Sequence, residues 1–217
     1  MNFRDFLFFS DRFCKFCLDE KINSSFICPS CEEKLEYIDN LIEIGDNPCH
    51  VIYFYNNFLR ENFRKYKFEK KSHMARPFAS LYIKYMRKKN LLDYDYLIYV
   101  PISRKRELFR AYNQVELIGR WISKDLKIEM GTFLSKTFET KEQNKSSSLQ
   151  RKLNLSGSLG LKPSFKNGNK LEGKKLLVID DFVTTGQTLL EINSILMKKN
   201  PKSIDYLVLA SGNIEER

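Results

Sequence analysis

The sequence lacks any apolar run of the roughly 18 to 20 residues that a membrane-spanning helix requires. Its apolar N-terminal stretch, residues 6–9, is short and closely flanked by charged residues, which is not the pattern of a secretory signal peptide. The absence of both signals predicts a cytoplasmic protein. Cysteine is also scarce, with five in 217 residues, and in a reducing compartment these thiols are not expected to form disulfides.

The composition supports a folded core, because 42% of the residues are apolar and 13% are aromatic. A chain of this length fits one ordinary α/β domain and a small accessory module. Lysine and arginine number 37 against 27 acidic residues, which gives a formal net charge of +10. This excess favours polyanionic partners such as nucleic acid, phosphorylated ligands or an acidic lipid surface. A lysine-rich surface without such a partner is the alternative.

Basic residues are interleaved with aromatic ones in three segments, residues 60–67, 84–89 and 104–110. Proteins that bind single-stranded nucleic acid use this mixture, since the charges contact the backbone and the rings stack on bases. One hypothesis is therefore that the chain binds single-stranded DNA with little sequence preference, with Tyr66 stacked on a base. The alternative is that these segments are merely solvated surface. The candidate contacts are Lys65, Tyr66, Lys67, Lys88 and Lys89.

Four of the five cysteines form two pairs, Cys14-x2-Cys17 and Cys28-x2-Cys31. A C-x2-C turn lets two thiolates bind one ion at about 2.3 Å, and a second such turn completes a tetrahedron. The spacing therefore predicts a structural zinc site closed by four thiolates. Disulfides are the alternative, but they belong to oxidising compartments. A redox-active C-x-x-C would be a single motif near a βαβ unit.

Cys49 and His50 are adjacent in the sequence. A nucleophilic Cys–His pair needs adjacency in space and a third group that orients the base. We therefore interpret both as ordinary structural residues. His73 lies near the start of a predicted helix, where a surface position is the simpler interpretation.

Strand-like and helical segments alternate from residue 51 onward. Apolar strand-like runs occupy residues 51–55, 96–100, 175–179 and 204–210, with a further strand beginning at Phe133. Amphipathic helical patterns lie between them, at residues 74–86, 115–126 and 188–199. This alternation predicts an α/β fold with a parallel sheet and right-handed crossovers.

The predicted division of the chain follows from these patterns. The cysteine pairs place a zinc-binding module at residues 1–50, and the alternating segments place an α/β domain at residues 51–217. Residues 139–158 are polar and show little periodicity, which predicts a mobile surface loop.

The segment after the strand at 175–179 carries the chemistry. That strand would deliver Asp180 and Asp181 to the carboxyl edge of a parallel sheet, where ligands bind in such folds. Two adjacent carboxylates can accept hydrogen bonds from neighbouring hydroxyls of one sugar. The residues that follow are small and include a glycine, so backbone N–H groups can converge at a helix N-terminus and form a phosphate cradle. The predicted ribose 5-phosphate site comprises Asp180, Asp181, Val183, Thr184, Thr185, Gly186, Gln187 and Thr188.

Two competing interpretations of these motifs are weaker. Residues 168–174 fit the G-x4-G-K pattern of a P-loop, but Lys175 occupies the position of the Mg²⁺-binding Ser or Thr, and the motif precedes a strand. A turn is the better interpretation there. Asp180 and Asp181 would alternatively cap a helix, but the Thr-Thr-Gly-x-Thr continuation favours phosphate binding.

The motif Asp-Asp-x-x-Thr-Thr-Gly-x-Thr at residues 180–188 resembles the loop that binds phosphoribosyl pyrophosphate (PRPP) in type I phosphoribosyltransferases. Together with the cysteine pairs, it makes the whole chain resemble the ComF family of competence proteins. Residues 100–106 and 110–114 are similar to that family's "VP-S-KR…RGFNQ" segment. Ala111 replaces the usual glycine, so the local backbone there could differ. Gln143, Arg151 and Asn154 resemble a later Gln…Arg…Asn run.

This resemblance implies a phosphoribosyltransferase-like fold that binds PRPP with Mg²⁺. It places Asp180 and Asp181 in the catalytic position, and Arg104, Lys105 and Arg106 at the leaving diphosphate, where cations neutralise developing charge. Residues 139–154 correspond to the loop that closes over PRPP. The resemblance also implies a role in natural transformation, in which the protein handles incoming single-stranded DNA and meets the uptake machinery at the inner face of the membrane.

The sequence leaves the activity open. A transferase needs a pocket for the accepting base, and no element for one is identifiable. The first hypothesis is a PRPP-binding competence protein that handles single-stranded DNA. The second is an active phosphoribosyltransferase of nucleotide or nucleobase metabolism with an unidentified acceptor. The third is a PRPP-responsive regulator of nucleotide genes, for which no DNA-reading helix pair is evident.

Overall fold

The computed structural model describes residues 13–23, 25–136 and 159–212. Gln143, Arg151, Asn154 and the predicted loop at 139–158 lie outside these ranges. No described helix is both long and apolar enough to cross a membrane. The described elements are α2 (Pro29–Glu33), β1 (Tyr37–Ile44), β2 (Asn47–Phe54), α3 (Asn57–Phe68), η2 (Ser72–Met74), α4 (Ala75–Lys88), β3 (Tyr96–Tyr99), α5 (Arg104–Arg110), α6 (Gln114–Leu126), β4 (Glu129–Gly131), β5 (Leu134–Lys136), β6 (Leu159–Leu161), α8 (Pro163–Lys166), β7 (Lys175–Val183), α9 (Gln187–Met197) and β8 (Ser203–Ser211).

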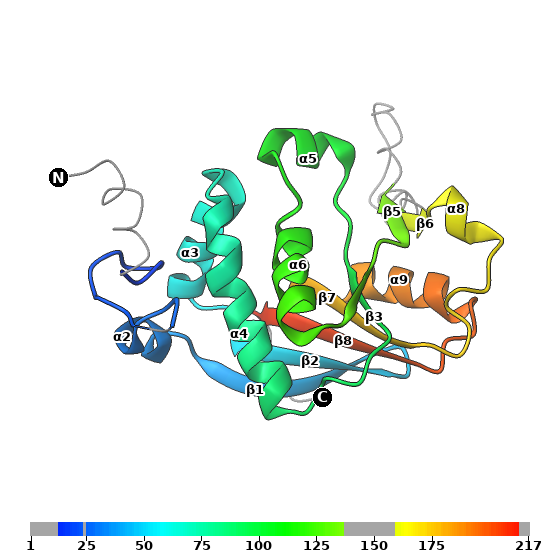
Figure 1. Cartoon of the computed structure of the whole chain (residues 1–217), viewed down its shortest axis with the longest axis horizontal. Coiled ribbons are helices and arrows are strands. Elements are labelled where there is room, and N and C mark those ends of the chain that lie inside the picture. The colour runs from blue at the N-terminus through cyan, green and yellow to red at the C-terminus, as the bar shows by residue number, and fades with distance from the viewer. Residues whose placement is uncertain (1–12, 24, 137–158, 213–217) are drawn as a thin grey trace.

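A six-stranded sheet forms the centre of the fold, in the order β1-β2-β8-β7-β3-β4 (Figure 1). The five strands from β2 to β4 in this order run parallel, and β1 pairs with β2 as an antiparallel hairpin at one edge. The register places Val178 of β7 opposite Tyr206 of β8 on one side and Ile98 of β3 on the other. The predicted α/β fold with a mostly parallel sheet is confirmed.

Strand β7 is buried on both faces, which explains its continuous apolar run. Leu176, Leu177, Val178 and Ile179 have no exposed surface. Leu177 and Ile179 pack in the apolar cluster that includes α3, α4 and α6, whereas Leu176 and Val178 pack in the cluster that includes α9. A strand covered on both sides is a rigid support for the polar residues at its end.

The sheet begins earlier in the chain than the sequence predicts. β1 and β2 are joined by Gly45 and Asp46, and Gly45 has a φ of +63°, a conformation that favours glycine. β2 begins at Asn47, so the predicted domain boundary at residue 50 falls inside this strand. The hairpin therefore belongs to the α/β sheet, and the accessory module ends before Tyr37.

The cysteine-containing segment shares its core with the helices of the sheet. The ring centroid of Phe16 lies 5.2 Å from that of Phe78 in α4 and 6.0 Å from that of Phe58 in α3. Phe16 and the buried Cys14 also belong to the same apolar cluster as α4 and α6. The accessory module is thus packed against the domain instead of being tethered beside it.

The strand predicted at Phe133 belongs to a second, two-stranded sheet. β5 begins at Leu134 and pairs antiparallel with β6, while β4 completes the main sheet. A Cβ atom at Gly131 would lie 2.5 Å from the ring of Phe133, so this approach requires glycine. Phe133 is buried in the core below the small sheet, with its ring centroid 5.0 Å from that of Tyr96.

Tyr66 lies in the core and not on the surface. Its side chain has no exposed area. The ring is stacked with those of Phe78 and Tyr112, at centroid distances of 5.4 and 5.5 Å. Its hydroxyl donates a hydrogen bond to the backbone oxygen of Gln114 at 2.8 Å. The hypothesis that Tyr66 stacks on a DNA base is therefore wrong, because no base can reach the ring.

We expect Tyr66→Ala to lower the free energy of unfolding by about 3–5 kcal/mol, the usual cost of deleting a large buried aromatic side chain. Tyr66→Phe keeps the ring and removes one hydrogen bond, so it should cost about 1–2 kcal/mol. Urea denaturation measures both changes. A parental urea midpoint for Tyr66→Ala would contradict this account of the core.

Candidate functional site

Strand β7 delivers two carboxylates to the carboxyl edge of the sheet. Asp180 and Asp181 are both partly buried there, and the Asp181 side chain is 13% exposed. The backbone N–H of Asp181 donates to Asp180 Oδ1 at 2.8 Å, and that of Phe182 donates to Asp181 Oδ1 at 2.7 Å. A carboxylate offers about four acceptor positions, so both side chains keep capacity for hydroxyl donors.

Asp181 is held by side chains from two helices. Lys67 of α3 places its Nζ 3.3 Å from Asp181 Oδ2, and Gln114 of α6 donates its side-chain N–H to the same oxygen at 3.1 Å. Arg110 is buried and donates to Gln114 Oε1 at 3.1 Å. The structure thus brings Arg110 and Gln114 to the site, although the sequence analysis assigns them no role there. It also places Lys67, a predicted DNA contact, beside a carboxylate.

Asp180 occupies less favourable electrostatic surroundings than its neighbour. Burial, followed by the charge of Asp181, raises the pKa of Asp180 well above its usual range. The buried side chain of Tyr82 packs beneath Asp180 and donates its hydroxyl to the backbone oxygen of Asp180 at 2.6 Å. A carboxyl group with a raised pKa at a ligand-binding edge is a candidate functional group.

The residues after β7 turn directly into α9. Gly186 is the N-cap of α9 and has a φ of +70°, and a Cβ atom there would lie 3.0 Å from Ile44 Cδ1. Backbone conformation and close packing both favour glycine at this position. The side chain of Val183 is buried, so Val183 offers only backbone groups to a ligand. The exposed side chains around the turn are Thr184, Thr185, Gln187 and Thr188.

The predicted diphosphate contacts lie on a helix and not on a loop. Residues after Pro101 form α5, with Ser103 as its N-cap. Figure 1 shows α5 standing above the helices that cover the sheet. Its first turn exposes Arg104, Lys105 and Arg106. Within the described part of the chain, none of these three hydrogen-bonds to Asp180 or Asp181, and their role at a diphosphate stays a prediction.

The turn between α5 and α6 positions Gln114. Ala111 has a φ of +70°, the left-handed conformation that glycine adopts at least cost. Asn113 then caps α6, because its Oδ1 accepts the backbone N–H of Val115 at 3.0 Å. The Asn113 side chain also donates to the backbone oxygen of Val100 at 3.0 Å, which ties α6 to the end of β3. Alanine therefore adopts a strained backbone conformation in this turn.

The four predicted metal ligands come together. The Sγ atoms of Cys14, Cys17, Cys28 and Cys31 all lie within 4.8 Å of one another. The distance between Cys17 and Cys28 is 3.8 Å, about the edge of a tetrahedron with metal–sulfur bonds of about 2.3 Å. The backbone N–H of Cys28 also donates to Cys14 Sγ at 3.3 Å. The cluster could hold a metal ion, and four thiolates suit zinc.

Cys49 and His50 lie in the interior strand β2. Burial raises the pKa of the Cys49 thiol to about 12, which makes it a poor nucleophile near neutral pH. His50 Nδ1 lies 3.2 Å from the hydroxyl oxygen of Tyr85, and burial lowers the pKa of His50. Both surroundings agree with a structural role.

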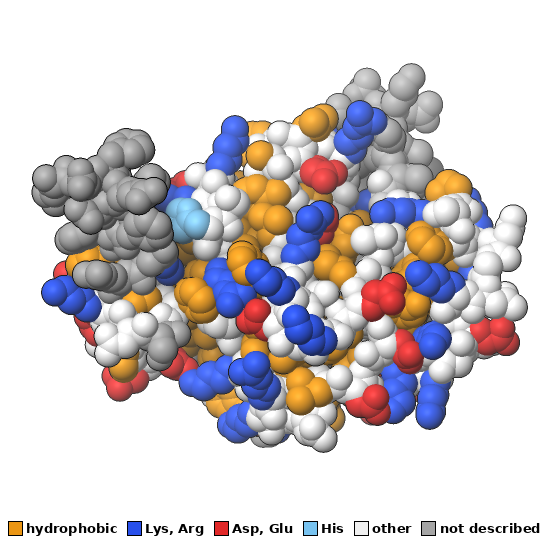
Figure 2. Space-filling view, in the orientation of Figure 1, with side chains coloured by type: hydrophobic (Ala, Val, Ile, Leu, Met, Phe, Trp, Pro, Cys, Tyr) orange, Lys and Arg blue, Asp and Glu red, His pale blue; other side chains and the backbone are white. Residues whose placement is uncertain are grey.

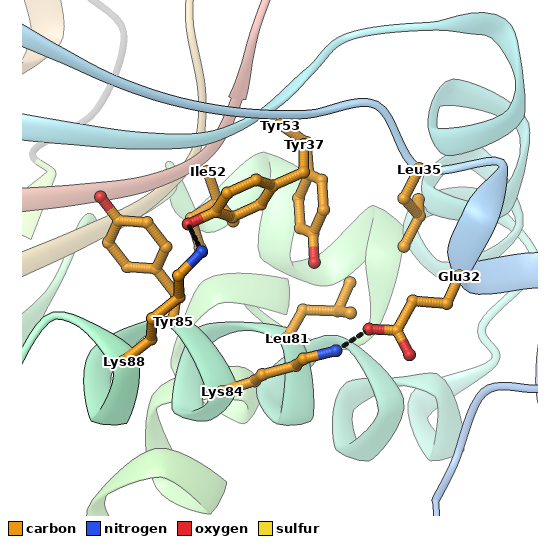
Figure 3. A pocket seen from close by; sticks show the side chains of 9 residues that line it. All are labelled: Glu32, Leu35, Tyr37, Ile52, Tyr53, Leu81, Lys84, Tyr85 and Lys88. Carbon is orange, nitrogen blue, oxygen red and sulfur yellow. Dashed lines mark hydrogen bonds and ion pairs between the residues drawn. The ribbon is translucent and has the colours of Figure 1, made fainter. Parts of the chain in front are cut away.

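Two other predicted DNA contacts lie at the far end of α4. Lys88 Nζ is 3.0 Å from the hydroxyl oxygen of Tyr37, and Lys89 Nζ is 2.6 Å from Asp39 Oδ2. Figure 3 shows Lys88 beside a pocket of about 240 Å³ between α2, α4 and the hairpin. Helix α4 begins near the end of α3 (Figure 1) and is about 20 Å long at 1.5 Å per residue. Lys67 therefore does not form one continuous basic surface with Lys88 and Lys89.

The positive charge is not gathered into a single patch on the face in Figure 2, where acidic side chains lie among the basic ones. Lys65 is half-buried on α3. Its contact with DNA stays a prediction.

The fold is of the phosphoribosyl transferase type. A family model described as "Phosphoribosyl transferase domain" matches residues 117–217, which include β7, the turn after it and α9. A purine phosphoribosyltransferase structure from Pyrococcus horikoshii covers 66% of this chain and 78% of its own, with 16% identity and a TM-score of 0.39. The assignment rests on the sheet topology and the family match.

Relatives of the chain are competence proteins. Competence protein ComFC of Streptococcus pneumoniae is 29% identical over 184 residues, which are 82% of this chain and 77% of that protein. Competence protein F of Haemophilus influenzae is 30% identical over 115 residues. That match covers 52% of this chain and about half, 49%, of the relative. The chain is thus similar to ComF-type competence proteins over most of its length, as the resemblance implies.

We expect Ala111→Gly to stabilise the protein by about 0.5–1 kcal/mol. The left-handed conformation costs alanine about 1–2 kcal/mol, and the greater freedom of glycine in the unfolded chain offsets part of that gain. Ala79→Gly, inside α4, is the matched control and should destabilise by at least about 1 kcal/mol. Urea denaturation compares the two. Equal destabilisation by both substitutions would contradict the strained turn.

Proposed function

We propose that this protein is a competence protein that binds PRPP with Mg²⁺ and handles incoming single-stranded DNA in the cytoplasm, next to the uptake machinery at the inner face of the membrane. The observation that carries the PRPP assignment is the end of β7, where two carboxylates directly precede the N-terminus of α9. The competence relatives support the cellular role.

The ribose of PRPP would lie against the two carboxylates. Asp181 is fixed by Lys67 and Gln114, so it offers an oriented, charged acceptor to one sugar hydroxyl. Asp180 would accept the neighbouring hydroxyl. The 5′-phosphate would meet the backbone N–H groups of the turn and the N-terminus of α9, an arrangement that suits an anion by hydrogen bonding and by helix dipole.

The diphosphate of PRPP implies Mg²⁺. This hard cation prefers oxygen ligands and keeps several waters, so one or two carboxylates beside a diphosphate suffice. Asp180 and Asp181 are the carboxylates at this edge that could contribute to its binding. When bound, Mg²⁺ would neutralise charge on the diphosphate. Arg104, Lys105 and Arg106 are our candidates for the side chains that also neutralise the charge of the diphosphate. To reach it, α5 would have to approach the ligand.

An active phosphoribosyltransferase with an unidentified acceptor is the second candidate. The observation that favours it is Asp180, whose pKa is raised at the ligand-binding edge, because such groups are frequent in catalytic sites. Release of diphosphate from PRPP across a panel of nucleobases tests this candidate. Release with any one base would favour it over simple binding.

We expect Asp180→Asn and Asp181→Asn each to weaken PRPP binding about ten- to hundredfold. Each substitution removes a charge-assisted hydrogen bond worth about 1.5–3 kcal/mol. Isothermal titration calorimetry with Mg²⁺ and PRPP measures the affinities. Asp125→Asn on α6, which alters the ion pair of Asp125 with Arg76 of α4, is the matched control and should bind normally. Parental affinity of the double Asp180→Asn, Asp181→Asn variant would show that the site is misplaced.

The pH dependence gives an independent check on Asp180. A carboxyl group that accepts sugar hydroxyls binds best when ionised, and the pKa of Asp180 in the free protein is raised. Binding below that pKa must release a proton, so PRPP affinity should rise with pH and level off above it. Asp180→Asn should flatten the profile. A parental pH slope in that variant would contradict this role.

We expect one zinc ion per chain, bound by the four clustered cysteines, and its removal to loosen residues 13–36. Metal-binding free energy contributes directly to folding in such modules. Phe58 and Phe78 should also lose packing, since Phe16 rests on both, while β7 and β8 stay protected. Hydrogen exchange of Cys28→Ser measures this, with Cys49→Ser as a control that keeps zinc. Metal-free native protein with five titratable thiols would refute the site.

A further inference from the structure

A cavity of about 460 Å³ lies against α3 at the same edge of the sheet as Asp181. Its walls come from one face of α3 and from the residues at the ends of β2 and β7. We call it the α3 cavity. Lys67 lies in its wall and donates to Asp181 Oδ2, so the cavity adjoins the proposed ribose site through one shared side chain.

Four aromatic rings line the α3 cavity. The centroid of the Phe182 ring lies 4.4 Å from that of Tyr55 and 4.7 Å from that of Phe63, which fixes all three rings in one packed group. Phe68, at the end of α3, is 50% exposed, yet the Arg110 guanidinium lies 5.4 Å from its ring centroid and supports it. An exposed ring held in place beside an open cavity is suited to stacking on a planar ligand.

Cations follow the same face of α3. Arg60, Arg64 and Lys67 are spaced by four and three residues, which places them in a row along one side of the helix. Glu61 is the acidic residue in the lining, and Lys67 is already paired with Asp181, so Arg60 and Arg64 are the cations that the cavity offers to a phosphate. Arg64 is paired with Glu69 at 3.2 Å, but both side chains are well exposed, at 59% and 38%. Such a surface pair is weak and yields readily to a phosphate.

These two features together identify the ligand class. Aromatic walls alone would suit any flat apolar molecule, and a row of cations alone would suit any polyanion. A nucleotide unit has a ring to stack and a phosphate to pair, and a strand repeats that phosphate along the helix. The volume also exceeds what a bare nucleobase would fill, which leaves room for its sugar.

We propose that the α3 cavity binds a nucleobase together with its phosphate, with the base stacked on Phe68 and the phosphates on Arg60 and Arg64. The proposal rests on the handling of single-stranded DNA proposed above, and it names the surface that does so. This surface differs from the set predicted from sequence, since Tyr66 is buried and Lys88 and Lys89 lie at the far end of α4. The same chemistry is present in a free nucleotide, and the experiment separates the two sources.

Fluorescence anisotropy with a labelled 12-residue oligodeoxythymidine measures strand binding, and thymidine 5′-monophosphate serves as the competitor for the free-nucleotide arm. Phe68→Ala should weaken strand binding about tenfold, because one stacked base is lost, while Phe68→Trp should retain it. Arg60→Gln with Arg64→Gln should make the slope of log affinity against log salt shallower by about 1.4, from about 0.7 per phosphate contact on a single strand.

Two controls separate this site from folding and from general charge. The urea midpoint of each variant should differ from that of the parent by no more than a substitution of a surface residue causes. Each variant should also still bind PRPP with Mg²⁺ through Asp180 and Asp181. Lys198→Gln with Lys202→Gln removes the same charge at the opposite, amino-terminal edge of β8. That double variant should leave the salt slope unchanged.

The outcomes are distinct. Weak binding by Phe68→Ala with rescue by Phe68→Trp supports the α3 cavity. Parental strand binding in Phe68→Ala and in the double arginine variant overturns it, and leaves the proposed function standing. In a third outcome, the parent does not bind the strand but binds the monophosphate, and Phe68→Ala abolishes that binding. This result supports the cavity as a free-nucleotide site and removes DNA from the proposed function. If the parent binds neither the strand nor the monophosphate, the α3 cavity proposal and the DNA handling in the proposed function are both overturned.

Discussion

The contact of Lys67 and Gln114 with Asp181 is the interaction on which the site depends. It joins α3, α6 and β7 at one oxygen atom. Burying a carboxylate that is only 13% exposed is costly without a partner. Helices α3 and α6 must therefore pack close enough to the end of β7 to place Lys67 and Gln114 against Asp181. Arg110 is connected to the site through Gln114, and the α3 cavity through Lys67. Asp181, which we propose as a sugar acceptor, is therefore part of one arrangement with the α3 cavity and the turn before α6.

The part of the site that is contiguous in sequence could be predicted, because one strand and one turn contain it. Asp180, Asp181 and Gly186 lie at the end of a buried strand and in the turn after it, so the local pattern alone places them together. Lys67 and Gln114 could not be found in this way, since their approach to Asp181 depends on how two helices pack. Tyr66 and Lys67 are neighbours with opposite environments, and a basic-aromatic pattern alone does not tell which of them faces the core.

The parallel sheet and its helices followed from the alternation of patterns, but its edges did not. The hairpin of β1 and β2 was missed because β1 mixes polar and apolar residues without a clean alternation. The Gly45-Asp46 pair ahead of the apolar run of β2 is the signal that indicates this hairpin. At Ala111 the replacement of glycine predicts a change in the backbone, whereas the residue adopts the left-handed conformation that glycine favours, next to the Asn113 cap that ties α6 to the end of β3.

The position of β2 in the sheet has a consequence for how the chain assembles. Cys49 of β2 is paired with Tyr206 of β8, so β2 must wait for a strand that is synthesised after β3, β4 and β7. Until β8 arrives, β2 and β7 each present an open edge, which is a template for pairing with other chains. Such distant pairing also slows folding. A nascent chain that stalls before β8 would thus be prone to aggregate. The sheet can be completed only after β8 has been synthesised.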